Sequence, residues 1–289
     1  MSSSHCLLAP MYVPEFSQTA HRYYNTHFRF IVSILDHVGC RIEYFKPNLK
    51  HDCSRSLFYC WFDGLRVLFD ISDYHAPPTS QETRSVEAVF KFHPNPDDPA
   101  ASGSLVFPFS PISFYDWVEY RRLRNTIKYR SCGTILSNQR PHTQNRERRT
   151  FVQELLANRY ASEFDNSCTS QLQFWQKINE ALVSVCVPGA RLDILDRGQL
   201  QYMALGACTL SPPISVALPF GERLIAGKHY LQCRPDWADL IERIEWVRDN
   251  SAQCIDIGFR AKELFETRLS PQPLFMWLLK CMNIVIGEQ

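Results

Sequence analysis

The sequence has almost no net charge, no long apolar run and no clustered cysteines, and each absence excludes a class of protein. Its 31 Lys and Arg side chains balance 30 Asp and Glu, which argues against a protein that mainly coats nucleic acid. No apolar run approaches the roughly 20 residues of a membrane-spanning helix, and residues 1–5 lack the features of a signal peptide. We therefore expect a cytoplasmic protein without a membrane span.

Several catalytic and metal-binding motifs are also missing. The 11 cysteines form no C-x-x-C pair, which argues against a structural zinc site and favours buried, reduced thiols. The sequence has no G-x-S-x-G elbow, no G-x-x-x-x-G-K-[ST] loop, no H-E-x-x-H helix and no G-x-G-x-x-G after its first strand. These absences disfavour serine hydrolases, P-loop nucleotidases, zinc proteases and dinucleotide oxidoreductases.

The chain instead alternates short apolar strands with amphipathic helices, which predicts an α/β fold with parallel sheets covered on both faces. The Asp63-Gly64 turn between two apolar runs predicts a β-hairpin. We expect two lobes that meet at a cleft, an N-terminal lobe of residues 1–135 and a C-terminal lobe of residues 136–289. The expected strands are 6–13, 41–45, 57–62, 65–71, 86–92, 105–109, 133–136, 183–187, 208–210 and 229–233, and the expected helices are 27–38, 150–159, 171–182, 198–205, 237–247, 257–265 and 271–285.

Basic side chains are concentrated between residues 119 and 149, where the sequence has nine Arg and Lys and only two acidic residues, Glu119 and Glu147. Arginine suits bidentate capture of phosphate, although a solvated helix surface remains open for residues 121–128. Helix N-termini and the carboxyl ends of parallel strands are where α/β proteins bind anions. We predict phosphate contacts from four residues between an expected strand and an expected helix: Ser137, Arg140, Arg146 and Arg149.

A second segment, residues 188–208, runs from a Pro-Gly turn into a short helix that begins near Asp196. Asp196 could cap this helix or contact a ligand. Arg197 is unfavourable at a helix start unless an anion lies nearby, and a nucleotide diphosphate would supply that anion. Gln199 and Gln201 could hydrogen-bond the same nucleotide, or lie on an exposed helix face.

Three segments of the second half carry a family resemblance: 200–210 (LQYMALGACTL), 227–231 (GKHYL) and 236–250 (DWADLIERIEWVRDN). With the arginines before them, they resemble the C-terminal lobe of GT-B glycosyltransferases, and among these the capsule-associated-protein-like family that includes protein O-glucosyltransferases. The resemblance covers about residues 130–280, and the short first lobe departs from the family.

The resemblance implies two Rossmann-like lobes of the GT-B type, with the C-terminal helices packing back across them. It also implies transfer of a sugar from a nucleotide-activated donor, bound mainly by the second lobe, to a hydroxyl acceptor on a glycan, a saccharide, a protein or a modified base. GT-B enzymes typically need no metal or other cofactor, so arginines and helix N–H groups would neutralise the departing diphosphate.

An inverting transfer needs a base that takes the acceptor proton, whereas a retaining transfer does not. Asp73 is the first candidate for this base, His75 is the second, and Asp70 could orient either one. Asp73 could also simply cap a turn, and His93 is a further candidate.

Two other classes of function stay open. The chain could bind or modify nucleic acid through the arginine-rich segment, or it could be a catalytically silent interaction module of the same fold. Steep salt dependence of nucleic-acid binding would favour the first, and absence of nucleotide binding would favour the second.

Overall fold

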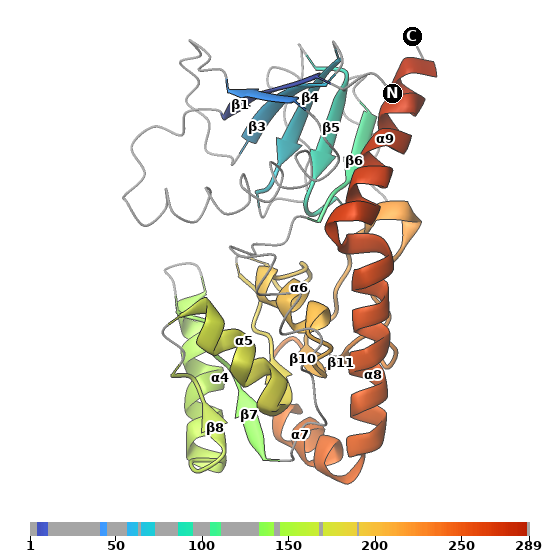
Figure 1. The fold of residues 1–289 in the computed structure, drawn as a ribbon. Helices are drawn as coiled ribbons and strands as arrows, with labels where there is room; N and C mark the ends of the chain where they lie inside the picture. The colour runs from blue at the N-terminus through green and yellow to red at the C-terminus, as the bar shows by residue number, and fades with distance from the viewer. Residues whose placement is uncertain are drawn as a thin grey trace. The chain divides into compact units, whose positions relative to one another are not determined.

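The computed structural model describes most of the second half of the chain and the strands of the first half (Figure 1). The described residues are 5–10, 41–44, 57–62, 65–72, 86–94, 105–110, 133–141, 145–167, 170–189 and 191–287. Side chains are described from residue 65 onward. The elements form a mixed α/β fold with parallel strand pairs, which confirms the predicted α/β class.

The chain forms two compact units. Unit 1 comprises residues 1–115, 217–222 and 268–289, and unit 2 comprises residues 116–216 and 223–267. The C-terminal helix therefore belongs to the unit of the N-terminal strands. The predicted cleft and the predicted division between acceptor and donor lobes, 1–135 and 136–289, stay predictions.

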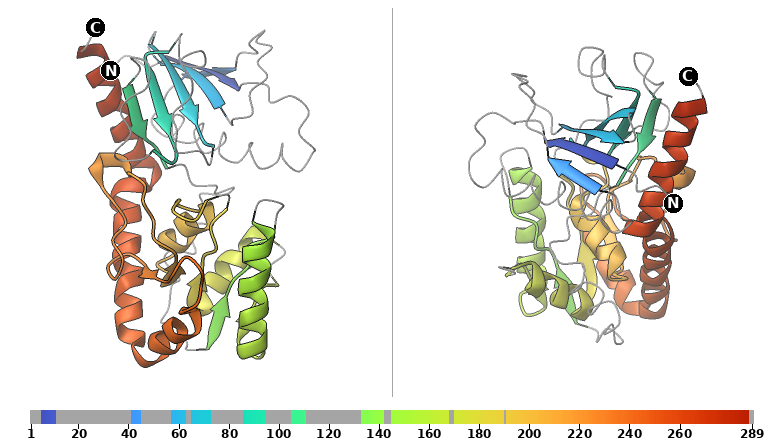
Figure 2. Two further views of the ribbon diagram at one scale, coloured as in Figure 1. Left: turned by 180° about the vertical axis from the view of Figure 1, so that it is seen from behind. Right: turned by 45° about the horizontal axis from the view of Figure 1, so that its top comes forward.

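Unit 1 is built on a six-stranded sheet, which Figure 2 shows from two further directions. Its strands are β1 (His5–Pro10), β2 (Arg41–Tyr44), β3 (Leu57–Phe62), β4 (Leu65–Asp70), β5 (Ala88–Lys91) and β6 (Leu105–Pro108). They lie side by side in the order β2-β1-β3-β4-β5-β6. β4, β5 and β6 run parallel, whereas β3 pairs antiparallel with β1 and β4. The predicted hairpin is confirmed, and it makes this sheet mixed, because a two-residue turn joins only antiparallel strands.

Aromatic side chains cover one face of the parallel part of this sheet. Phe69 of β4 stacks on Phe90 of β5 with ring centroids 5.2 Å apart, and Phe107 of β6 lies 5.7 Å from Phe90. These three residues are register partners. Because side chains alternate along a strand, the next residue on each strand points to the opposite face.

Helix α9 (Pro271–Gly287) and the short turn η2 (Pro219–Gly221) also belong to unit 1. The Trp277 Nε1 donates to the main-chain oxygen of Pro108 at 2.7 Å, and its ring centroid lies 5.0 Å from that of Phe220. These contacts hold α9 and η2 to the end of β6. Helix α9 occupies the predicted range and extends two residues beyond it.

Unit 2 contains a wholly parallel sheet of five strands in the order β11-β10-β9-β7-β8. Its strands are β7 (Thr134–Leu136), β8 (Phe164–Asp165), β9 (Ala181–Val185), β10 (Thr209–Ser211) and β11 (Leu231–Gln232). The helical elements around it are α4 (Arg146–Arg159), α5 (Gln171–Glu180), α6 (Arg197–Ala204), α7 (Leu240–Asp249), α8 (Ser251–Leu264) and η3 (Phe265–Leu269). Numbered along the chain, the spatial order is 2-1-3-4-5, one of the two common doubly wound arrangements.

Local sequence explains where the helices of unit 2 begin. Ser170 and Gln173 form a capping box at the start of α5, since each side chain bonds to the other's main-chain N–H. Helix α4 begins four residues before the predicted start, because its first turn, residues 146–149, is polar and shows no apolar periodicity. Strand β8 was not predicted, because two residues give no alternation.

The core of unit 2 lies between the sheet and helices α4, α7 and α8. Ile135, Val183 and Val185 of the strands pack with Val152 of α4 and Ile244 of α7. No single helix in the described part of the chain is long and apolar enough to span a membrane, and only the bent pair Ser251–Leu269 and Pro271–Gly287 passes that test together.

The chain leaving α6 touches α8 backbone to backbone. Gly206 has a φ of 69°, in the left-handed region that glycine adopts without strain. A Cβ placed on Gly258 of α8 would lie 2.2 Å from the main-chain oxygen of Gly206. Glycine at position 258 is therefore what allows this contact.

Candidate functional site

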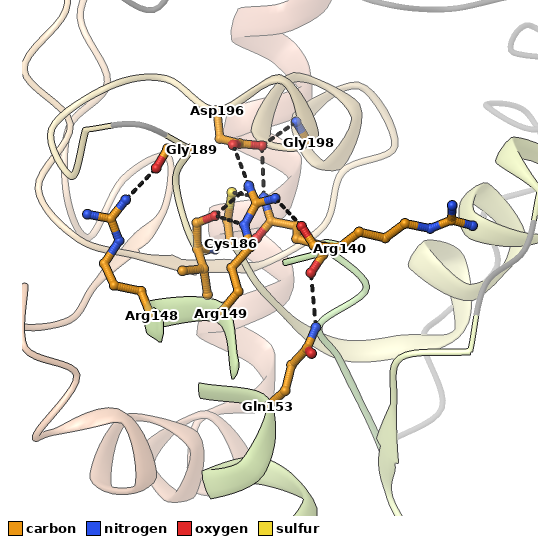
Figure 3. A network of polar contacts seen from close by, with 10 residues as sticks. Arg140, Arg148, Arg149, Gln153, Cys186, Gly189, Asp196 and Gly198 are labelled. Carbon is orange, nitrogen blue, oxygen red and sulfur yellow. Dashed lines mark hydrogen bonds and ion pairs between the residues drawn. The ribbon is translucent and has the colours of Figure 1, made fainter. Parts of the chain in front are cut away.

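The strand order of unit 2 places its ligand-binding edge between β7 and β9. In a 2-1-3-4-5 sheet, the connections from the first and third strands leave in opposite directions, and ligands bind at the carboxyl ends there. The residues at this point are 137–141 after β7 and 186–189 after β9. The start of α6 joins them through a network of polar contacts (Figure 3).

Gln139 connects the loops after β7 and β9 with the start of α6. Its Oε1 accepts a hydrogen bond from the Val187 main-chain N–H, and its Nε2 donates to Asp196 Oδ1 at 2.8 Å. Gln153 of α4 donates to the main-chain oxygen of Gln139 at 3.0 Å. The amide of Gln139 is thus satisfied on both sides, which fixes the separation of the three segments.

Arg149 holds the same segments from the α4 side. Its Nε and Nη2 donate to Val187 O at 3.2 and 3.1 Å, and its Nη1 donates to Arg140 O at 2.7 Å. Its Nη2 also lies 3.3 Å from Asp196 Oδ2, in a pair whose side chains are 9% and 14% exposed. The guanidinium is therefore turned onto main-chain carbonyls and one carboxylate of its own unit, as Figure 3 shows.

Asp196 is the N-cap of α6, which is one of the two roles predicted for it from the sequence. Its Oδ1 accepts from Gly198 N at 2.8 Å, and Arg149 offsets its charge. A Cβ on Gly198 would lie 3.1 Å from that same Oδ1, so glycine allows the carboxylate to sit close to the helix.

Arg197 is the first residue of α6 and is partly buried. Desolvation by burial lowers the pKa of its guanidinium from 12.5 to about 9, which leaves it charged at neutral pH. A cation at a helix N-terminus is electrostatically unfavourable, and an anionic ligand would relieve both the burial cost and the repulsion.

Two other residues predicted to bind the donor are buried at this edge. Gln199 in the first turn of α6 is 1% exposed, and neither of its amide atoms has a hydrogen-bond partner among the described residues. The Ser137 Oγ is likewise buried without a partner in the described part of the chain. Such groups cost stability unless a ligand or water satisfies them.

The remaining predicted donor residues lie in different surroundings. Gln201 accepts from Trp175 Nε1 at 2.8 Å, so its carbonyl serves the contact between α5 and α6. Arg140 and Arg146 are exposed, and the Arg140 side chain extends away from the network in Figure 3. Arg148, which was not among the site predictions, donates to the main-chain oxygen of Gly189.

The catalytic candidates belong to unit 1. Asp73 and His75 lie outside the described residues. Asp70 is fully buried at the end of β4, where Lys91 Nζ lies 2.9 Å from its Oδ2 and Ser72 bonds to its Oδ1. His93 is buried two residues after the end of β5.

Sequence reasoning missed the roles of Gln139 and Lys91. Gln139 lies in a four-residue polar stretch that was singled out for Ser137 and Arg140, but its spacing gives no sign of a contact with Asp196. Lys91 is a single charge within the apolar run Phe90-Lys91-Phe92, and that isolation is the signal that could have identified a buried pair.

Within the described residues, no three His, Cys, Asp or Glu side chains lie close enough together to hold a metal ion. Metal independence stays a prediction.

No protein-family model matches the chain. Matching curated proteins include the uncharacterized protein 035R of Invertebrate iridescent virus 3, 38% identical over 55 residues, and the uncharacterized protein 179R of Invertebrate iridescent virus 6, 35% identical over 54 residues. Each match covers 19% of this chain and only 5% of the viral protein.

Solved structures similar to the chain include two from bacteria. One is the C-terminal domain of a glycosyl transferase group 1 family protein from Francisella tularensis, with a TM-score of 0.36, 10% identity, and coverage of 53% of this chain and 79% of that one. The other is a glycosyltransferase from Rickettsia africae, with a TM-score of 0.49, 10% identity, and coverage of 96% and 85%.

Proposed function

We propose that the chain is a glycosyltransferase that moves a sugar from a nucleotide-activated donor to a hydroxyl acceptor, with the donor bound by unit 2. The observation that carries the proposal is the edge between β7 and β9, where a parallel sheet, a helix N-terminus and a partly buried Arg197 come together. The resemblance of residues 130–280 to GT-B donor lobes supports the same choice.

The residues of this edge form two groups: those that would contact the donor and those that hold the surrounding loops in position. Arg197 is the cationic side chain in the first turn of α6, and we assign it to the donor diphosphate. Gln199 and Ser137 have polar atoms without a partner in the described part of the chain, and a nucleotide or sugar could bond to them. Arg149 and Gln139 act as positioning residues.

Arg140 and Arg146 remain candidates for outer contacts to phosphate, because both are exposed near this edge. We leave Gln201 out of the donor site, since its carbonyl is bonded to Trp175. Asp73 remains the proposed base of an inverting transfer and His75 the second candidate. Asp70 remains the residue that could orient either one, and its own oxygens bond to Lys91 and Ser72.

The transfer breaks the bond between the anomeric carbon and the diphosphate, and the charge that develops on the leaving oxygen needs stabilisation. Arg197 and the α6 N-terminus would supply it without a metal ion. Metal independence is therefore part of the proposal and is tested with it.

A thermal-shift panel of UDP, GDP, CMP and dTDP, each with EDTA and with Mg²⁺, tests the proposal. A ligand at about 100 times its Kd stabilises the folded state by about 2.7 kcal/mol, which raises Tm on the order of 5 °C. We expect one nucleotide to raise Tm equally under both conditions. Failure of all four would refute a nucleotide-sugar site, and a shift only with Mg²⁺ would refute metal independence.

The nucleic-acid alternative has no better support. Arg148 and Arg149 of the arginine-rich segment donate to carbonyl oxygens of their own unit rather than pointing to solvent. The silent-module alternative predicts no nucleotide binding, so the same panel separates it from the enzyme.

A further inference from the structure

Two buried cysteines of unit 2, Cys208 and Cys254, lie next to each other where the chain leaving α6 meets α8. Cys208 directly precedes β10, and its main-chain oxygen accepts from Ser184 N of β9 at 2.9 Å. Cys254 lies in the first turn of α8. Both cysteines are 1% exposed and belong to the same apolar core. Neither of them takes part in the proposed donor site.

The backbone contact between Gly206 and Gly258 brings the two cysteines together. A Cβ on Gly258 would lie 2.2 Å from Gly206 O and 3.1 Å from the carbonyl carbon of Ala207, so the chain there runs directly against α8. Cys254 precedes Gly258 by about one helical turn, and both are buried on the same side of α8. Because Cys208 follows Ala207 in the chain, it reaches the same side of α8 as Cys254.

The two thiols are hydrogen-bonded to each other. The Cys208 thiol bonds to the Cys254 thiol and lowers the pKa of Cys254 below its ordinary 9.0, although burial acts in the opposite direction. The Cys254 Sγ also lies 3.8 Å from Val247 O, to which it donates. By contrast, burial raises the pKa of three other cysteines in the described part of the chain: Cys186, Cys233 and Cys281. Because the thiolate is the form that reacts with oxidants, Cys254 should be oxidised more readily than these three.

We propose that Cys208 and Cys254 form a reversible disulfide on exposure to hydrogen peroxide, and that this cross-link stabilises unit 2. The Cys254 thiolate attacks one peroxide oxygen and breaks the O–O bond, which gives a sulfenic acid and a hydroxide that takes up the thiol proton. The Cys208 thiol then attacks the sulfenic sulfur, forms the S–S bond and releases water. Two thiols are thus oxidised to one disulfide while one peroxide is reduced to two waters, and a thiol reductant restores both cysteines. The inference is independent of the proposed transferase function.

The cross-link would restrict the unfolded chain more than the folded one. It closes a loop from residue 208 to residue 254, which contains β10, β11 and α7. Closing a long loop removes conformational freedom from the unfolded chain. Because the two thiols are already in contact in the folded unit, the bond requires little rearrangement there. Oxidation should therefore raise Tm.

Peptide mapping of the full chain tests this inference. The protein is treated with hydrogen peroxide, its remaining thiols are alkylated under denaturing conditions, and the non-reduced digest is analysed by mass spectrometry. We expect a peptide pair joined through Cys208 and Cys254 that disappears after treatment with dithiothreitol. We also expect Tm to rise by about 5 °C on oxidation. Absence of this peptide pair, or a link from either cysteine to a different cysteine instead, would overturn the inference.

Two variants separate the cross-link from other effects of peroxide. Cys254→Ala cannot form the bond, so peroxide should not raise its Tm. The matched control is Cys281→Ala, which removes a buried cysteine of α9 and should form the link and gain Tm as the wild type does. An equal rise in Tm for Cys254→Ala would overturn the inference. The peptide map of the wild type tests the inference even if neither variant folds.

Discussion

Replacing Arg149 with Met should destabilise unit 2 far more than loss of an ordinary surface arginine. The change leaves Asp196 without its cationic partner and removes the guanidinium donors from Val187 O and Arg140 O. A mostly buried carboxylate that loses the neighbouring cation costs about 1–3 kcal/mol, and the two carbonyl oxygens that lose their donors add about 1 kcal/mol. We therefore expect the free energy of unfolding to fall by about 3 kcal/mol.

Urea unfolding followed by tryptophan fluorescence and circular dichroism measures this loss. The control is Arg260→Met, which removes an exposed pair with Asp256 and should cost less than about 1 kcal/mol. Adding Asp196→Asn to Arg149→Met removes the charge that lost its partner but keeps a capping side chain, so the double variant should regain about 1 kcal/mol. A loss of stability no larger than that of Arg260→Met, or no recovery in the double variant, would refute this prediction.

Two further predictions concern stability alone. Gly258→Ala should lower the free energy of unfolding by about 2 kcal/mol, because its Cβ would lie 2.2 Å from Gly206 O, whereas Gly287→Ala meets nothing within 4 Å and should leave urea unfolding unchanged. Burial would raise the pKa of Asp165, but hydrogen bonds from Lys177 and Ser167 hold it below its ordinary 3.8. The ionised Asp165 therefore stabilises the folded state above pH 3.8, and this stabilisation is lost as the pH falls through the lowered pKa. In Lys177→Met, the free energy of unfolding should depend less steeply on pH between pH 5 and 2. An equal loss in the free energy of unfolding for both glycine variants would contradict the first prediction. An unchanged pH dependence of that free energy in Lys177→Met would contradict the second.

Elements with a strong local signal were predictable from the sequence. The Asp63-Gly64 turn located the antiparallel strands β3 and β4, and the apolar spacing of Phe174, Trp175 and Ile178 located α5. Long-range pairing was not predictable in this way. The sheet of unit 1 is mixed, and the C-terminal helix packs in the unit of the first strands. The periodicity of apolar residues in the sequence indicates neither arrangement.

In the candidate site, too, only the residues with a local sequence signal could be predicted. Asp196 and Arg197 could be singled out because a helix start has recognisable residue preferences. The inward turn of Arg149 and the bridging amide of Gln139 depend on how three distant segments meet at the sheet edge. An arginine-rich stretch therefore predicted an anion site while mixing residues that face a ligand with residues that hold the chain.

The central claim is that Arg197 binds the diphosphate of a nucleotide donor, and calorimetric titration of Arg197→Met tests it most directly. The titrant is whichever nucleotide stabilises the wild type. The control is Arg191→Met, because Arg191 is exposed and lies in the loop that precedes α6. Because burial lowers the pKa of Arg197, its charge costs folding energy at neutral pH, so the variant should be at least as stable as the wild type. We predict at least tenfold weaker nucleotide binding by Arg197→Met and unchanged binding by Arg191→Met. Equal nucleotide affinity in Arg197→Met and the wild type would contradict it.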